Sequence, residues 1–208
     1  MEFHFLVFDN VEELDLVGPW ELVGLLADRK LCPPPLLVTL NSSTPVGAHR
    51  MRFVADAHYS ETGQPDVLFV PGGSGARAAA IDPEVISYLR DRGQGCKSVL
   101  SVCTGSYLMQ KAGLLSGRKA TTHWAFLDHL RSDWSIEVTE RRFVKDGNIW
   151  TSGGVSAGMD MMLAFIDDSF GTDVAADIQL EAEYFPSSKI YGRPFDKENV
   201  SEYIKLLA

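Results

Sequence analysis

The residue with the clearest chemical potential is Cys103, because it lies between two segments of different pattern. Residues 98–102 form a mostly apolar run typical of a buried strand, and residues 104–112 have a helical pattern that ends at Gly113. A thiol at such a turn lies at the positive end of the helix dipole, which lowers its pKa and favours the thiolate. The turn resembles a nucleophile elbow, although Ser101 replaces the first glycine of that motif. We therefore predict that Cys103 is a nucleophile with strained backbone angles. A small buried core cysteine is the alternative.

A second candidate is Asp15, an acidic residue between Leu14 and Leu16 in the loop expected after a strand at residues 3–8. Partial burial there would raise its pKa and let the carboxyl group hold or deliver a proton. The alternative is a capping acid before a helix that begins near Pro19. The local pattern alone favours the capping role.

A glycine-rich segment, residues 71–75, follows an apolar run at residues 67–70. It lacks the lysine of a Walker motif and the spacing of a dinucleotide-binding loop, so a phosphate site is not predicted. Gly72 and Gly73 are instead predicted to direct backbone N–H groups at Cys103, as an oxyanion-type substrate site. An ordinary strand-to-helix turn is an equal alternative.

His123 follows another expected strand. A Cys–His pair would activate the thiol, whereas the alternative is a histidine that caps the next helix or lies at a dimer surface. We favour the alternative, for a reason given with the family resemblance below. The other histidines have no metal-ligand spacing with one another or with the cysteines, so no metal site is predicted.

Short apolar runs alternate with helical patterns along the chain. Strands are expected at residues 3–8, 36–40, 67–70, 98–102, 119–122, 136–144 and 149–151. Helices are expected at residues 19–26, 83–92, 104–112, 124–130, 156–169 and 173–184. Asp146-Gly147 predicts a hairpin turn. This order predicts a single α/β domain over residues 1–208, with a doubly wound, mostly parallel sheet covered by helices on both faces.

In a sheet of this kind the ligand binds at the carboxyl ends of the strands. Asp15, Gly72, Cys103 and Gly154 each follow an expected strand. We therefore expect these residues to meet at one edge of the sheet.

The bulk composition excludes several classes of partner. The formal net charge of −9 argues against a nucleic acid or an anionic membrane, because both need a basic surface. No apolar stretch is long enough to span a membrane, and the first residues do not have the pattern of a signal peptide. Three cysteines are an odd number, which suits free thiols in a reducing, cytoplasmic compartment.

A set of motifs in this sequence is specific in combination. It comprises residues 14–19 (LDLVGP), 71–73 (PGG), 101–105 (SVCTG), 113–115 (GLL), 120–124 (ATTHW) and the segment 146–154 from Asp-Gly to Gly-Gly. Together these motifs resemble the ThiJ/PfpI branch of the class I glutamine amidotransferase-like superfamily and, within it, the isocyanide hydratases. The resemblance extends from about residue 3 to about residue 184.

The resemblance implies a flavodoxin-like fold and a homodimer with the active site near its interface. It also implies a small-molecule isocyanide as substrate, hydrated to an N-substituted formamide without a metal or organic cofactor. Cys103 would be the nucleophile, and Asp15 the acid that hydrogen-bonds the sulfur and transfers protons. Thr104 would match the threonine that follows the family cysteine, and Val155 an apolar residue beside the active-site helix.

Two departures from other branches narrow the prediction. Protease-like members have a histidine directly after the nucleophile, whereas Thr104 occupies that position here. The late His–Glu pair of the amidotransferases is also absent. These departures argue against peptidase activity and against His123 as the base for Cys103.

Other functions of the same fold remain open. One is the sensor domain of AraC-type regulators, but only residues 185–208 follow Tyr184, which is too short for a helix-turn-helix region. A second is a stand-alone ligand-binding protein or thiol-based redox sensor. A third is a glyoxalase-like cysteine hydrolase using the same thiol.

Overall fold

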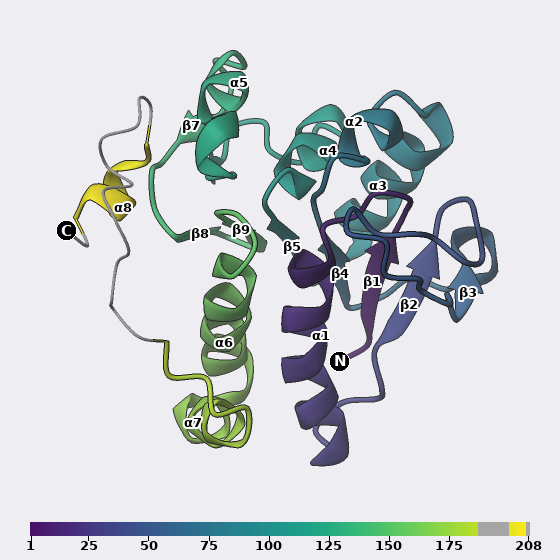
Figure 1. Cartoon of the computed structure of the whole chain (residues 1–208), viewed down its shortest axis with the longest axis vertical. Helices are drawn as coiled ribbons and strands as arrows, with labels where there is room; N and C mark the ends of the chain where they lie inside the picture. The colour runs from purple at the N-terminus through teal and green to yellow at the C-terminus, as the bar shows by residue number, and fades with distance from the viewer. Residues whose placement is uncertain (187–199, 207–208) are drawn as a thin grey trace.

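The computed structural model describes residues 1–186 and 200–206. Its core is a seven-stranded sheet with the order β3-β2-β1-β4-β5-β9-β8 (Figure 1). The strands are β1 (Phe3–Val7), β2 (Leu36–Thr39), β3 (Ala57–His58), β4 (Val67–Val70), β5 (Ser98–Val102), β8 (Phe143–Asp146) and β9 (Ile149–Ser152). All neighbouring strands are parallel except β8 and β9, which form an antiparallel hairpin. A separate two-stranded sheet pairs β6 (Lys119–Ala120) with β7 (Glu137–Val138).

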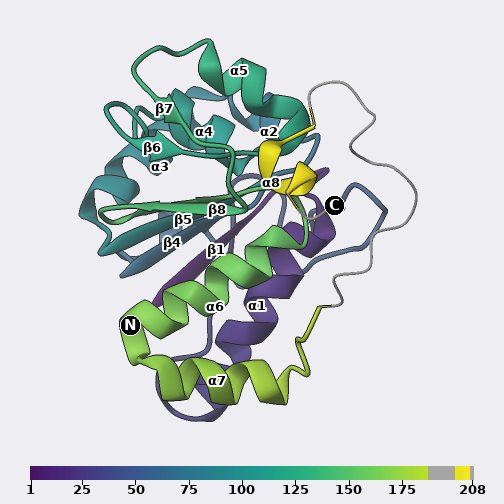
Figure 2. The ribbon, with the colours of Figure 1, turned by 90° about the vertical axis from the view of Figure 1, so that its left-hand side faces the viewer.

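Helices cover both faces of the sheet, as Figure 2 shows. On one side lie α1 (Glu13–Asp28), α6 (Ala157–Phe170) and α7 (Thr172–Glu181). On the other lie α2 (Ala76–Ala79), α3 (Pro83–Gly95) and α4 (Gly105–Lys111). The shorter helices are η1 (Tyr59–Glu61), η2 (Trp124–Phe126), α5 (Leu127–Arg131) and α8 (Glu202–Lys205). This arrangement confirms the predicted flavodoxin-like α/β architecture.

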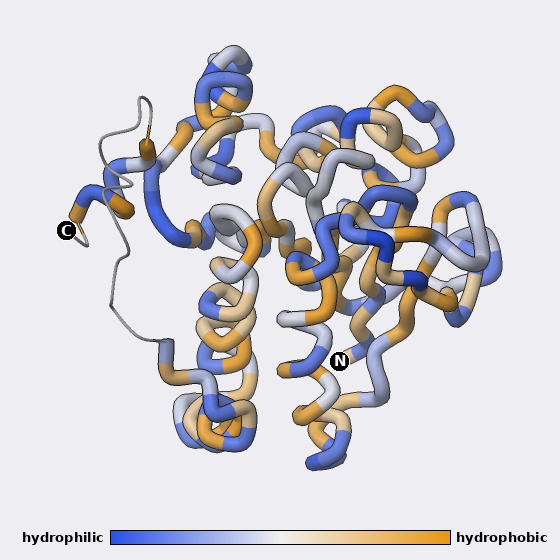
Figure 3. The backbone as a smooth tube through the Cα atoms, viewed as in Figure 1, coloured by the Kyte–Doolittle hydropathy of each residue, from blue (hydrophilic) through white to orange (hydrophobic). Residues whose placement is uncertain are grey.

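The sequence patterns explain both layers. The central strands β1, β4 and β5 are apolar runs buried almost throughout, as expected of strands covered on both faces. The helices alternate between hydrophilic and hydrophobic residues along their length (Figure 3), because each buries only one face. Burying these faces against the sheet supplies the main favourable free energy of folding.

Helix α1 differs most from its prediction. It begins at Glu13 instead of residue 19, so Pro19 lies inside the helix and Asp15 lies in its first turn instead of a loop. A proline inside a helix removes the hydrogen bond to the carbonyl four residues earlier, here that of Asp15. The ring of Pro19 packs closely against Gly158 of α6, and this tertiary contact offsets part of the cost.

Three smaller corrections concern short elements. The strand expected at residues 119–122 is β6, which ends at Ala120 and belongs to the small sheet. The long strand expected at residues 136–144 is divided into β7 and β8. The strands β3 and helices α2 and α8 have no counterpart in the sequence prediction, because each is too short to show a periodic pattern.

Candidate active site

Cys103 lies directly after β5, at the carboxyl edge of the sheet, and its φ is +55°. Its N–H donates to the carbonyl oxygens of Ser152 (3.2 Å) and Gly153 (3.1 Å). Its own carbonyl accepts hydrogen bonds from the hydroxyls of Ser106 (3.0 Å) and Thr122 (2.9 Å). A left-handed φ is costly for a residue other than glycine and persists where surrounding contacts fix it. The predicted strained elbow is confirmed.

The elbow packs tightly against the end of β4. A Cβ at Gly105 would lie 2.1 Å from the carbonyl oxygen of Val70, so only glycine permits this approach. The glycine two residues after the cysteine therefore sets how deeply the elbow is placed in the fold.

Asp15 is fully buried, and both of its carboxyl oxygens accept backbone hydrogen bonds. Oδ2 accepts from the N–H of Gly72 and Oδ1 from the N–H of Val155, each at 3.0 Å. The Cys103 thiol is close enough to the carboxyl group to lower its pKa. Burial raises the pKa of Asp15 to about 7, against the opposing effect of the Gly72 hydrogen bond and with a further increase from the charge of Glu12. The alternative of a capping acid is not supported, since the side chain joins three segments that are distant in sequence.

Thr104 connects the elbow to the glycine-rich turn. Its hydroxyl accepts from the N–H of Gly73 (3.0 Å) and donates to the carbonyl of the same residue (3.1 Å). The N–H groups of Gly72 and Gly73 are therefore both occupied, by Asp15 and Thr104. The prediction that these two amides form an oxyanion-type site is not supported by their partners. Gly72 is needed instead for close approach, since a Cβ there would lie 2.5 Å from the nitrogen of Thr104.

The ionisation of Cys103 differs from the sequence prediction. Burial raises the pKa of the Cys103 thiol, and the negative charge of Asp15 raises it further. Hydrogen bonding to the backbone and side chain of Thr104 opposes this rise. The expected lowering by the helix dipole is therefore wrong: the thiol is only 7% exposed, and α4 is a helix of 7 residues. Cys103 and Asp15 form a buried pair whose titrations are coupled.

A cavity of about 300 Å³ opens onto the thiol. Of the predicted residues, Cys103, Thr104, Gly73 and Val155 line it, whereas Asp15 lies behind the thiol. Val155 has a φ of +53°, and this second strained turn directs its N–H at Asp15. The carboxyl edge of the sheet thus brings together the residues that the sequence placed after separate strands.

The cavity also has lining residues that the sequence analysis did not identify, namely Glu12, Ser74, Arg77 and Phe126. Ser74 lies within the glycine-rich segment 71–75 but was given no role, and the other three belong to no motif. The available signal was proximity along the chain, since each lies within a few residues of a motif that was recognised.

His123 has the expected capping role and also borders the cavity. Its Nδ1 accepts the N–H of Ala125 at the start of η2, at 3.2 Å. Burial lowers the pKa of His123, so the ring is neutral at neutral pH and its proton is on Nε2. Gly154 must be glycine, because a Cβ there would lie 2.2 Å from the imidazole.

Comparison with known proteins identifies the fold and the family. The DJ-1/PfpI family model matches residues 1–168. The chain belongs to the DJ-1/PfpI family. It is 36% identical to an isonitrile hydratase of Pseudomonas putida over 197 residues, which cover 94% of this chain and 82% of that protein. The resemblance inferred from the motifs is thereby confirmed.

Other members of the DJ-1/PfpI family have different functions. A solved ThiJ/PfpI family protein from Pseudomonas syringae matches with a TM-score of 0.85 and 31% identity, covering 98% of this chain and 82% of that one. The transcriptional regulator GbdR of Pseudomonas aeruginosa is 29% identical over 84% of this chain, which corresponds to 48% of the regulator. Membership therefore establishes the fold but does not by itself select one reaction. No helix in the described part of the chain is both long and apolar enough to cross a membrane.

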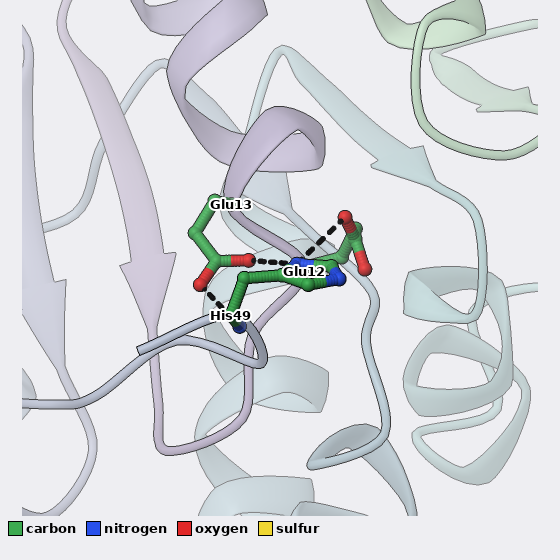
Figure 4. Close-up of side chains that lie close together, drawn as sticks. All are labelled: Glu12, Glu13 and His49. Atoms are coloured by element: carbon green, nitrogen blue, oxygen red, sulfur yellow. Dashed lines mark hydrogen bonds and ion pairs between the residues drawn. The ribbon is translucent and has the colours of Figure 1, made fainter. Parts of the chain in front are cut away.

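A cluster of two acids and a histidine lies beside the cavity, formed by Glu12, Glu13 and His49 (Figure 4). Their potential ligand atoms lie within 4.8 Å of one another. Glu13, however, already accepts hydrogen bonds from the backbone N–H of His49 (2.6 Å) and from its Nδ1 (2.8 Å). These contacts anchor the loop that carries His49 to the start of α1, which accounts for the cluster without a metal.

Proposed function

We propose that this protein is an isocyanide hydratase, which adds water to an isocyanide and produces an N-substituted formamide. The observation that carries the proposal is the buried Cys103–Asp15 pair at the base of a small cavity. The likeness to the isonitrile hydratase of Pseudomonas putida supports this reaction over others available to the fold.

The first step forms the bond between sulfur and carbon. Asp15 in its carboxylate form accepts the thiol proton as Cys103 attacks the isocyanide carbon, and then returns that proton to the same carbon. The product is a thioimidate, in which carbon carries the sulfur, one hydrogen and a double bond to nitrogen. A pKa of about 7 suits this role, since the carboxyl group can both accept and release a proton near neutral pH.

The second step uses one water molecule. Water adds to the thioimidate carbon, nitrogen takes a proton, and the carbon–sulfur bond breaks to release the formamide and regenerate the thiol. The overall change is addition of one water without oxidation or reduction. We therefore propose that no metal or organic cofactor is required. We also propose that the protein acts in the cytoplasm and, from the family resemblance, that it is a homodimer.

Two further residues support the geometry of the pair. Thr104 opposes the rise in the pKa of Cys103 and fixes the glycine-rich turn through its hydroxyl. Val155 donates its N–H to Asp15 and presents an apolar side chain to the cavity. We propose that both are positioning residues.

The alternative of a peroxide-type thiol sensor is less well supported by the site. Oxidation by peroxide requires the thiolate, and the pKa of Cys103 is raised. A glyoxalase-like hydrolase would use the same thiol and is tested alongside the hydratase.

The test is a panel of aliphatic and aryl isocyanides assayed for formamide by NMR, with methylglyoxal adducts as the competing substrates. We expect formamide formation by the wild type, incorporation of oxygen from labelled water, and a mass increase on Cys103 equal to one isocyanide when the reaction is quenched with acid. Folded protein that forms no formamide from any member of the panel would overturn the proposal.

A further inference from the structure

The cavity contains one arginine, Arg77, which comes from α2. Its guanidinium carbon lies over the ring of Phe126, 5.6 Å from the ring centroid, and both side chains line the same cavity as Cys103. A guanidinium held by an aromatic ring loses less conformational entropy on binding a ligand than one free in solvent.

This guanidinium has no anionic partner among the residues that the structure describes. No carboxylate of residues 1–186 and 200–206 lies within 4 Å of it, and it makes no hydrogen bond to them. Of the ten arginines that the structure describes, four pair with carboxylates (Arg29, Arg118, Arg131 and Arg142), and six, Arg77 among them, do not. Arg77 is exposed, and it is the one arginine of the described residues that lines the cavity with Cys103, in a chain whose formal net charge is −9.

The acidic residue on the cavity wall, Glu12, forms no ion pair with Arg77 and lies beside a histidine instead. Glu12 lies 3.6 Å from Nδ1 of His49, which also contacts Glu13 at 2.8 Å (Figure 4). Hydrogen bonding to Glu13 and the charges of Glu12 and Glu13 raise the pKa of His49, because the imidazole lies beside both acids. His123 on the opposite chain segment is neutral, because burial lowers its pKa.

We propose that Arg77 determines substrate specificity by binding a carboxylate on the substituent of the isocyanide. The apolar part of that substituent would contact Phe126 and Val155, while the isocyanide carbon reaches Cys103. Arginine suits this task because its planar fork of N–H donors matches a carboxylate with two parallel hydrogen bonds. The inference rests on the proposed hydratase function and names its substrate class as isocyano carboxylates.

The first test measures anion recognition through the alkylation rate of Cys103, and does not depend on isocyanide hydration. Iodoacetate and iodoacetamide differ mainly in charge, and both alkylate thiols. Their rates at Cys103 are measured by mass spectrometry in the wild type, in Arg77→Gln, and in Lys111→Gln. Lys111 is the matched control, since it lies over the neighbouring ring of Tyr107 at 5.3 Å and does not line the cavity.

We expect Arg77→Gln to lower the ratio of the iodoacetate rate to the iodoacetamide rate by about tenfold, the scale of one charge-assisted bidentate contact. Lys111→Gln should change the ratio by less than about twofold, because a charge outside the cavity is screened over about 8 Å at physiological salt. A ratio that is equal in wild type and Arg77→Gln overturns the proposal, as does an equal fall in both variants.

The second test uses para-isocyanobenzoate and para-isocyanobenzamide, which have nearly the same shape. We expect the wild type to prefer the carboxylate by about tenfold in kcat/KM, and Arg77→Gln to lose that preference. Equal hydration of the two compounds, or preference for the amide, overturns the assignment of the substrate class. If neither compound is hydrated, the proposed function fails, and the alkylation ratio still decides whether Arg77 recognises carboxylates.

Discussion

The two ends of strand β5 each carry a cysteine, and their surroundings differ. Cys96 precedes the strand with an ordinary φ of −77°, and Gln64 Nε2 contacts its sulfur at 3.3 Å. Cys103 follows the strand with a φ of +55° and faces a buried carboxyl group. Burial raises the pKa of both thiols, that of Cys96 to about 11. Burial and a high pKa therefore do not distinguish the proposed nucleophile from Cys96.

The two ends of the sheet differ in the groups that surround each thiol. At the carboxyl end, the turns after β4 and β9 direct the N–H groups of Gly72 and Val155 at Asp15. These donors stabilise a carboxyl group in a buried position, where it would otherwise be strongly disfavoured. Cys96 has no carboxyl group among its hydrogen-bond partners. The carboxyl edge thus supplies a proton acceptor to one thiol only.

The largest expected effect comes from removing each thiol in turn. Cys103→Ala should lower kcat/KM for isocyanide hydration by about 10³-fold or more, since the covalent step is lost. Cys96→Ala should leave kcat/KM within about threefold, because this residue lies at the opposite end of β5. Comparable losses in both folded variants would show that the cysteines act through stability instead of chemistry.

The second effect concerns Asp15. Asp15→Asn should lower turnover by roughly 10²-fold or more, the scale for losing a general acid–base group. Each oxygen of Asp15 accepts one backbone N–H, whereas asparagine has only one side-chain oxygen. The NH₂ group of the new asparagine must therefore face the N–H of Gly72 or that of Val155, which places two donors together. The variant therefore needs a circular-dichroism check of the fold. Asp28→Asn, at the exposed end of the same helix, should retain wild-type turnover; retention of turnover by Asp15→Asn as well would remove Asp15 from the mechanism.

The sequence was sufficient for the central strands and the chemical pair. Segments 67–70 and 98–102 were predicted with the observed bounds, because an apolar run bounded by glycine, proline or a polar turn has few other solutions. The start of α1 was predicted wrongly because Pro19 fits a first turn by local rules, and its packing on Gly158 is a tertiary contact. For the same reason no pattern indicated that Arg77 meets Phe126 across the cavity.

The raised pKa of Cys103 also depends on tertiary structure. The sequence indicates that Cys103 lies at the start of a helix. It does not indicate that the sulfur is shielded from solvent by residues distant in the chain. Asp15 was identified through its motif, but its contacts with Gly72 and Val155 join residues far apart in the chain. Sequence reasoning therefore named residues that lie together in the candidate site and assigned the wrong sign to the pKa shift of Cys103.

The third effect is the dependence of rate on pH. In the reactive form, the Asp15–Cys103 pair has one proton in total. That proton is either on the Cys103 thiol or on the Asp15 carboxyl group. This form predominates above the first pKa of the pair, which is about 7. We expect kcat/KM to fall about tenfold per pH unit below that value and to level off above it. In Asp15→Asn the rise should move to alkaline pH, where the isolated thiol ionises; an unchanged profile in the variant would contradict the pairing.

The last effect is on stability and not on rate, and its sign follows from the same pKa. In the unfolded chain Asp15 ionises near its ordinary value of 3.8, whereas in the folded protein it keeps its proton up to about pH 7. The folded state therefore binds more protons than the unfolded state between these values. Its contribution to stability is fully present below about pH 4 and is lost as pH rises towards 7. Because one pKa unit corresponds to about 1.4 kcal/mol, the total change is of the order of 4 kcal/mol.

This contribution can be isolated by comparing urea unfolding of the wild type and Asp15→Asn at several pH values. Asparagine does not titrate, so its altered hydrogen bonding changes the free energy of unfolding by the same amount at every pH. The other ionisable groups are present in both proteins, and their contributions cancel when the two free energies are subtracted. We expect the stability of the wild type relative to the variant to decrease steadily from pH 4 to pH 8. A constant difference across this range would mean that folding does not raise the pKa of Asp15, and that its carboxylate is a weaker base for the thiol proton than the mechanism requires.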